Sequence, residues 1–245
     1  MELEIIAHRG FSAKSPENTL AAFSLAIARG ADSIEFDIQL AAGGLPVVIH
    51  DPTLNRTTGT WGNVAQKTLE QIKALDAGSW FSPEFAGERI PTLKETLLAV
   101  QAIPKYIYLD VKKHCDWTME QVQYLLEMLT EEGWQDRCIV SSFSDKFVRQ
   151  LLELSSDFTI GYIVGNSKDY KTQLAKAANA KKAAIISQYR VFLKEPSLVE
   201  SARNQGIDVV AWTVDSPQDF QRLTDIGVKR IITNCLIEKQ LAISS

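Results

Sequence analysis

The sequence has few cysteines and no excess of positive charge. Of its 245 residues only Cys115, Cys138 and Cys235 are cysteines, and none of them forms a Cys-x-x-Cys pair. Such a scattered, odd-numbered set is typical of thiols in a reducing compartment rather than of disulfides or a zinc site. The 26 Lys and Arg against 30 Asp and Glu give a net charge of −4. This balance argues against binding nucleic acid or an anionic membrane by bulk charge.

Targeting features are absent from the sequence as well. No apolar run approaches the ~18 residues of a transmembrane helix. The first ten residues lack the basic start and apolar stretch of a signal peptide. We therefore expect a cytoplasmic protein without a transmembrane segment. A chain of this length, with 45% hydrophobic residues, can form one barrel or two smaller domains, and nothing in it indicates an oligomeric state.

Short apolar runs alternate with amphipathic segments along the chain. The runs are rich in Ile and Val, as in parallel strands that are covered by helices. The expected strands are Leu3–Ala7, Ser33–Ile38, Tyr106–Val111, Cys138–Ser141, Thr159–Val164, Ala183–Ser187, Ile207–Trp212 and Arg230–Thr233. Eight such strands predict a (β/α)8 TIM barrel that forms a single domain over residues 1–245. An open doubly wound sheet is the alternative, but no Gly-x-Gly-x-x-Gly follows the first strand.

Capping signals support helices between these strands. Asn18 can cap a helix that stops at Gly30. Further helix starts are indicated by Thr92 with Glu95, Thr118 with Gln121, and Ser216 before Pro217.

Residues 51–91, which we call the inserted segment, depart from this alternation. The segment contains four of the 13 glycines and four large aromatics, with one evident short helix that Thr68 and Gln71 cap. An insertion after a barrel strand would lie over the barrel mouth, where active sites form. We expect it to help enclose the site; packing at the rim is the alternative.

Three acids stand where inward-facing positions of strands are expected. Glu35 and Asp37 share one face of a strand, because side chains alternate with a period of two. Since the apolar face of a barrel strand meets the helices, these carboxylates would point inward, where they need a cation or a proton. With Asp110 they would form an oxygen-rich site for Mg²⁺ or Ca²⁺. Alternation on a solvent-exposed strand would explain the same spacing without a site.

Two of the three histidines follow apolar runs near these acids. His8 ends the first strand and His50 ends the run from Pro46, so the pair can serve as general acid and general base. Arg9 is suited to clamp a phosphate or carboxylate, and a salt bridge to one of the acids is its alternative. We expect His114, in a polar loop, on the surface.

These residues lie in motifs that resemble the glycerophosphodiester phosphodiesterase family in order and spacing. The similarity is densest over residues 4–112 and continues to about residue 234. The motifs are His8–Gly10, Pro16–Thr19, Gly30–Asp37, Pro46–Asp51, Ile90–Leu93, Leu109–Lys112, Ser142–Phe143 and Ala211–Thr213. Several ordered motifs together are far more specific than one short pattern.

The resemblance implies a TIM barrel that hydrolyses glycerophosphodiesters to sn-glycerol 3-phosphate and an alcohol with one divalent cation. Residues 51–91 match the family's insertion, which helps to form the substrate pocket. By position, the resemblance implies catalytic histidines at His8 and His50, metal ligands at Glu35, Asp37 and Asp110, and substrate contacts at Arg9, Glu17 and Lys112. Trp212 can stack on the glycerol or pack in the core. The preferred alcohol, the ion and the role of each histidine stay open.

Two departures from the family pattern bear on the site. Asp110 stands where glutamate is usual and is one methylene shorter. Asn234 stands where aspartate is common, so we expect it to cap the last helix, while any other polar contact made there is in question.

Other functions remain compatible with the sequence. A Schiff-base lyase could use Lys112 as its nucleophile. A non-catalytic protein could retain the pocket to bind glycerophosphodiesters. A toxin-like phospholipase of related fold is disfavoured, because the chain begins without a secretory signal.

Overall fold

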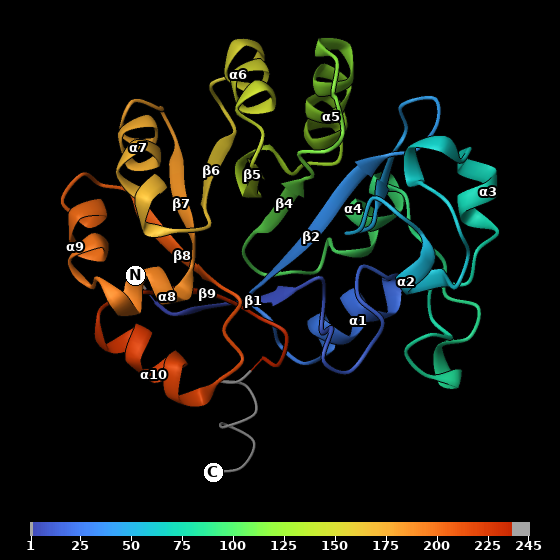
Figure 1. Cartoon of the computed structure of the whole chain (residues 1–245), viewed down its shortest axis with the longest axis horizontal. Helices are drawn as coiled ribbons and strands as arrows, with labels where there is room; N and C mark the ends of the chain where they lie inside the picture. Colours follow the sequence, from blue (N-terminus) through green and yellow to red (C-terminus); the bar gives the residue numbers. More distant parts are fainter. Residues whose placement is uncertain (1, 237–245) are drawn as a thin grey trace.

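The computed structural model describes residues 2–236, which form a closed barrel of parallel strands surrounded by helices (Figure 1). The sheet runs in the order β1-β9-β8-β7-β6-β5-β4-β2-β3, and pairing of β1 with β2 closes it. Only β3 among these strands is antiparallel, so eight parallel strands make the closed ring. The predicted (β/α)8 barrel is confirmed.

The strands lie close to the predicted apolar runs. They are β1 Glu4–His8, β2 Ser33–Leu40, β3 Pro46–Val48, β4 Ile107–Val111, β5 Cys138–Ser142, β6 Thr159–Val164, β7 Ala183–Gln188, β8 Asp208–Trp212 and β9 Arg230–Thr233. The short β3 folds back on β2 through a turn in which Gly43 and Gly44 both have positive φ. This hairpin extends β2 beyond the ring and places the residues after β3 beside the barrel mouth.

Helices follow the strands in the expected alternation. They are α1 Leu20–Ala28, α4 Leu93–Ala99, α5 Met119–Glu131, α6 Asp145–Leu154, α7 Ser167–Ala178, α8 Tyr189–Lys194, α9 Ser197–Arg203 and α10 Pro217–Asp225, with a 3₁₀ turn at Gln135–Arg137. The capping boxes at Thr92 and Thr118 are confirmed. The expected cap at Asn18 is wrong: the side chain of Thr19 accepts the Ala22 N–H and begins α1. None of the helices within residues 2–236 combines the length and the apolar composition needed to cross a bilayer.

The barrel has two apolar layers and a polar floor. One layer packs between strands and helices, and an inner one fills the ring around Ile6, Tyr108 and Ile232. Glu4 closes the amino-terminal end, where it accepts hydrogen bonds from Ser33 and Tyr108. Inward side chains near the carboxyl ends of the strands therefore face the one open mouth.

The inserted segment packs on its own small core beside the carboxyl end of β2 (Figure 1). Its elements are α2 Asn55–Thr58, a 3₁₀ turn at Val64–Gln66, α3 Leu69–Lys73 and a 3₁₀ turn at Pro83–Phe85. The predicted capping box at Thr68 begins α3, but α2 and the two turns were not evident from the sequence. The rings of Trp80, Phe81 and Phe85 contact one another edge-on.

The close approach of α1 to the residues after β1 leaves no room for a side chain at Gly10. Both Gly10 and Gly30 have positive φ, but a Cβ at Gly10 would lie 2.6 Å from the carbonyl carbon of Ala22, whereas one at Gly30 would meet nothing within 4 Å. Both alanine variants carry the strain of left-handed backbone. We expect Gly10→Ala to cost about 1–3 kcal/mol more than Gly30→Ala because of the clash. Urea unfolding measures the difference, and equal costs would contradict it.

Candidate active site

Strand register brings the predicted residues together at the barrel mouth. In the β1–β2 pair His8 lies opposite Glu35, and in the β2–β4 pair Asp37 lies opposite Asp110. Paired residues of neighbouring strands point to the same side of a sheet, here into the barrel. Four side chains from three strands therefore converge by register alone.

A cavity of about 150 Å³ opens at this mouth. Its polar lining comprises His8, Arg9, Glu35, Asp37, His50, Asp110 and Lys112, and the rest is Tyr108, Ser141, Phe143, Ile163, Ile186, Trp212 and Ile232. All predicted site residues except Glu17 are in this set. Trp212 lines the cavity and also packs against the inner barrel core, and its stacking on the glycerol stays a prediction.

The three acids form a compact cluster. Glu35, Asp37 and Asp110 each offer one carboxylate oxygen within 4.8 Å of the other two. Lys112 Nζ lies 2.6 Å from Asp37 Oδ1 and 2.6 Å from Asp110 Oδ2. Three carboxylates thus share two cations, the ammonium of Lys112 and the guanidinium of Arg9. If all three acids were ionised, their charge would exceed that of these two cations by one.

Burial and charge act on these acids in different directions. Burial raises the pKa of Glu35 well above its ordinary value and also raises the pKa of Asp110. Asp37 is buried too, but the charges of Lys112 and Arg9 outweigh burial and hold its pKa below the usual range. Asp37 is therefore the firmly ionised member of the cluster.

The cluster fits a divalent cation. Asp110 Oδ1 is buried and has no hydrogen-bond partner among residues 2–236, although a buried polar atom normally has one. All the atoms that the three acids offer to a metal are oxygens, the ligand type that Mg²⁺ and Ca²⁺ prefer. Glu35, Asp37 and Asp110 could hold the ion, which would share two of its carboxylates with Lys112. The shorter Asp110 side chain still leaves one oxygen for this purpose.

Arg9 is fixed by acids on three sides. Its backbone has a φ of 54°, in the left-handed region, and its N–H donates to Glu35 Oε2 at 3.0 Å. Arg9 Nε lies 3.1 Å from Asp37 Oδ2, and Nη1 donates to Glu17 Oε1 at 2.8 Å. Arg9 therefore forms a salt bridge with an acid of the cluster and also lines the cavity. Glu17 holds Arg9 and is not among the residues that line the cavity, and its substrate contact stays a prediction.

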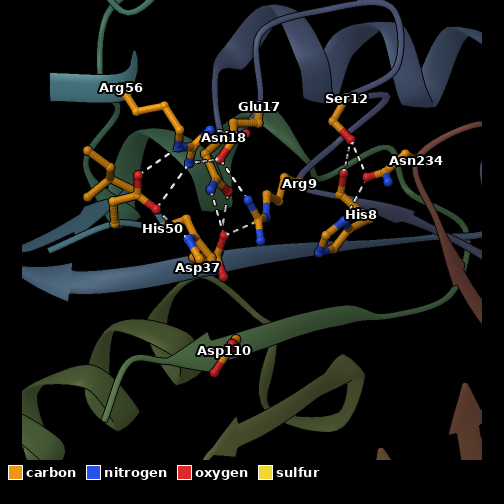
Figure 2. Close-up of polar contacts among 12 residues, drawn as sticks. His8, Arg9, Ser12, Glu17, Asn18, Asp37, His50, Arg56, Asp110 and Asn234 are labelled. Atoms are coloured by element: carbon orange, nitrogen blue, oxygen red, sulfur yellow. Dashed lines mark hydrogen bonds and ion pairs between the residues drawn. The ribbon is translucent and has the colours of Figure 1, made fainter. Parts of the chain in front are cut away.

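Asn18 is a site residue that the sequence analysis assigned to another role. Its backbone φ is 58°, which turns the side chain away from α1 and toward Asp37. Its Nδ2 donates to Asp37 Oδ2 at 2.7 Å, and the Asp37 N–H donates to its Oδ1 at 3.3 Å (Figure 2). The nitrogen and the oxygen of the Asn18 side-chain amide both bind Asp37, so Asn18 orients the Asp37 carboxylate.

The hydrogen bonds of Asn234 determine how His8 faces the cavity. Asn234 Nδ2 donates to the Asp215 carboxylate at 2.6 Å, so its Oδ1, 2.7 Å from His8 Nδ1, must accept from the ring. The other ring nitrogen, Nε2, lies 3.8 Å from Glu35 Oε2. Burial and the Arg9 charge lower the pKa of His8 to about 4. Near neutral pH the ring thus presents a lone pair at Nε2. The expected helix after Asn234 lies outside the described residues.

His50 is held by a carboxylate and by an anchored loop. Its Nδ1 lies 2.7 Å from Asp51 Oδ1. Gln39 is buried in β2, and its amide Nε2 lies 2.9, 2.8 and 2.6 Å from the carbonyl oxygens of Ile49, His50 and Asp51, which share its two hydrogens. His114 is exposed, as expected, and contacts Gln39 Oε1 at 2.7 Å. Sequence reasoning gave no role to Gln39, because a lone glutamine in a strand carries no motif signal.

The inserted segment contacts residues that flank the cavity through charged side chains. Among the described residues that line the cavity, none is an aromatic of residues 51–91. Trp80, Phe81 and Phe85 pack with one another, which fits the rim alternative, and Trp61 is exposed. Instead Arg56, on α2, contacts both Asp51 and Glu17. Arg56 was missed, because nothing local in the sequence relates it to residues so distant in the chain.

Comparison with known proteins gives one consistent family. Residues 8–237 match the Glycerophosphoryl diester phosphodiesterase family. A glycerophosphodiester phosphodiesterase of Caldanaerobacter subterraneus is 36% identical over 236 residues, covering 96% of this chain and 95% of that protein. An Oleispira antarctica phosphodiesterase, solved in complex with the product sn-glycerol-3-phosphate, superposes with a TM-score of 0.88 at 28% identity, covering 99% and 97% of the two chains. An Agrobacterium tumefaciens glycerophosphodiester phosphodiesterase gives a TM-score of 0.80 at 27% identity over 96% and 98%.

The acid cluster predicts a cation-dependent stability. Mg²⁺ or Ca²⁺ at ~100 times its dissociation constant should raise the unfolding midpoint of metal-stripped protein by roughly 5–10 °C. Asp110→Asn should reduce this rise by half or more, because it removes one anionic ligand. The control is Asp157→Asn, a surface acid paired with Lys181. Equal rises in all three proteins, measured by scanning calorimetry, would place the bound ion elsewhere.

Proposed function

Because this chain belongs to the glycerophosphoryl diester phosphodiesterase family, we propose that its cavity hydrolyses glycerophosphodiesters to sn-glycerol 3-phosphate and an alcohol. The observation that carries the proposal is the convergence at one mouth of three carboxylates, two cationic side chains and two imidazoles. The relative solved with sn-glycerol-3-phosphate supports the product assignment. The substrate is a small molecule that this cavity can hold.

The phosphate group is expected between the cationic side chains of Arg9 and Lys112 and the cluster of three acids. Arg9 and Lys112 would stabilise the negative charge that develops on the phosphoryl oxygens in the transition state, because their ammonium and guanidinium groups are already fixed in place. A divalent cation, Mg²⁺ or Ca²⁺, held by Glu35, Asp37 and Asp110 would add Lewis-acid polarisation of a phosphoryl oxygen.

We assign the two histidines to different steps by their hydrogen-bond partners. His8 donates from Nδ1 to a neutral amide, so its Nε2 is ready to accept a proton from the nucleophile, which is water or the neighbouring glycerol hydroxyl. His50 Nδ1 lies 2.7 Å from the Asp51 carboxylate, so an anionic group stands behind this ring and fixes its orientation. His50 is therefore the proposed general acid that protonates the departing alkoxide.

The environment of Lys112 does not suit the alternative of a Schiff-base lyase. A nucleophilic lysine must be a neutral amine, which requires a lowered pKa. Here Asp37 and Asp110 outweigh burial and raise the pKa of Lys112. A pure binding protein would have no need of two imidazoles with oriented Nε2 atoms, so hydrolysis accounts for more of the site.

Leaving-group dependence tests the assignment of the histidines. With glycerophosphodiesters of simple alcohols, His8→Ala and His50→Ala should each lose ~10²–10⁴-fold in kcat. With a nitrophenol leaving group, which departs without protonation, His50→Ala should regain most of its activity and His8→Ala should not. The measurement is the release of glycerol 3-phosphate and nitrophenol by variants with matching unfolding midpoints.

Either of two results would refute this assignment. Near-normal turnover of simple diesters by one of these variants would remove that histidine from the reaction. Recovery by His8→Ala instead of His50→Ala would reverse the two roles.

A further inference from the structure

We propose that Arg56 is a positioning residue that holds Arg9 and His50 in a fixed relative geometry by bridging Glu17 and Asp51. The expected effect of Arg56 on turnover rests on the proposed hydrolysis. The bridge itself rests on contacts of Arg56 that do not depend on that function. It gives the inserted segment a defined part in the reaction.

The guanidinium of Arg56 binds two carboxylates at once (Figure 2). Nη1 and Nη2 donate to the two oxygens of Glu17 at 2.7 and 2.8 Å. Nε and Nη2 donate to the two oxygens of Asp51 at 2.6 and 3.2 Å. Both contacts are bidentate, which fixes the direction of each carboxylate as well as its distance.

Each carboxylate in turn holds one group of the cavity. Glu17 Oε1 accepts from Arg9 Nη1 at 2.8 Å, and Asp51 Oδ1 lies 2.7 Å from His50 Nδ1. Glu17 precedes α1, whereas Asp51 follows β3, so these two anchors come from different parts of the chain. Arg56 joins them, and through them it joins the proposed phosphate contact to the proposed general acid.

The charges of this chain of contacts persist near neutral pH. Hydrogen bonds from Arg56 are the largest effect on Asp51 and lower its pKa to about 2. Burial alone would raise the pKa of Glu17, but the hydrogen bonds from Arg56 and the charge of Arg9 outweigh it and lower that pKa. Both carboxylates are therefore ionised and able to accept from Arg56 and from the residues they hold.

Local structure explains why Arg56 is available at this place. The Leu54 N–H donates to the Gly62 carbonyl at 3.0 Å, and the Val64 N–H donates to the Pro52 carbonyl at 2.9 Å, which closes the loop around α2. Leu54 is buried in the core of the inserted segment. Arg56 Cζ lies 5.9 Å from the centre of the Trp80 ring, so the aromatic group of the segment flanks the bridge.

A functional effect can be separated from a structural one at this position. The Arg56 side chain is 42% exposed and does not line the cavity. Surface ion pairs contribute little to stability. Loss of the bridge should therefore affect turnover much more than unfolding.

The test compares Arg56→Gln and Arg56→Lys with Arg222→Gln, which removes an exposed arginine whose Nη1 lies 3.1 Å from Asp219. We expect Arg56→Gln to lower kcat ~10–100-fold, as the loss of a supporting contact around a site typically does. Arg56→Lys should fall between Arg56→Gln and the wild type, because one ammonium cannot make two bidentate contacts. Arg222→Gln should retain the wild-type kcat, and the cation-dependent rise in unfolding midpoint should persist in every variant.

A spectroscopic measurement makes the test independent of turnover. The chain has three histidines, so ring ¹⁵N signals can be assigned with His8→Gln and His114→Gln variants. Arg56→Gln should shift or broaden the signals of His50, and Arg222→Gln should not. If the wild type hydrolyses no diester while these signals move, the proposed function fails and the positioning role stands. Wild-type kcat and unchanged His50 signals in Arg56→Gln would overturn the inference.

Discussion

The site depends on the confinement of three buried carboxylates at one end of the barrel with only two cations beside them. Burial raises the free energy of each ionised carboxylate, so these carboxylates need neighbouring side chains that orient and neutralise them. Lys112 contacts Asp37 and Asp110. Arg9, in left-handed backbone, contacts Glu35 with its N–H and Asp37 with its guanidinium. The same carboxylates fix the two cationic groups of the mouth, and they are the ligands of the proposed cation site.

The barrel and the main residues of the site were predictable because their signals are local. The period of two places Glu35 and Asp37 on one face, and the succession of apolar runs gives the strand order. The cap of α1 was wrong because Asn18 and Thr19 are adjacent and both suit an N-cap; the contact of Asn18 with Asp37, 19 residues away, decides between them. Arg56 meets Glu17 across 39 residues, and no periodicity encodes such a pair.

The inserted segment shows how an element can serve a cavity that its apolar side chains do not enter. Its aromatic residues predicted a cover over the mouth, since apolar groups in long loops often enclose a site. In the structure Trp80, Phe81 and Phe85 contact one another while Trp61 is exposed, and the segment contributes Arg56 and Asp51 to the polar network. Side-chain type alone could not separate the two outcomes, because it does not show which groups an aromatic ring will contact.

The two histidines differ in the groups behind them, and this difference gives the proposed proton transfer a direction. Each ring has its Nδ1 next to an oxygen acceptor, an amide for His8 and a carboxylate for His50. An aspartate at position 234 would place a carboxylate behind His8 as well. The neutral Asn234, held by Asp215, instead leaves His8 without a counter-charge at that nitrogen and next to Arg9. The asparagine at this position therefore makes the surroundings of the two rings unequal, which suits the proposed division into a general base and a general acid.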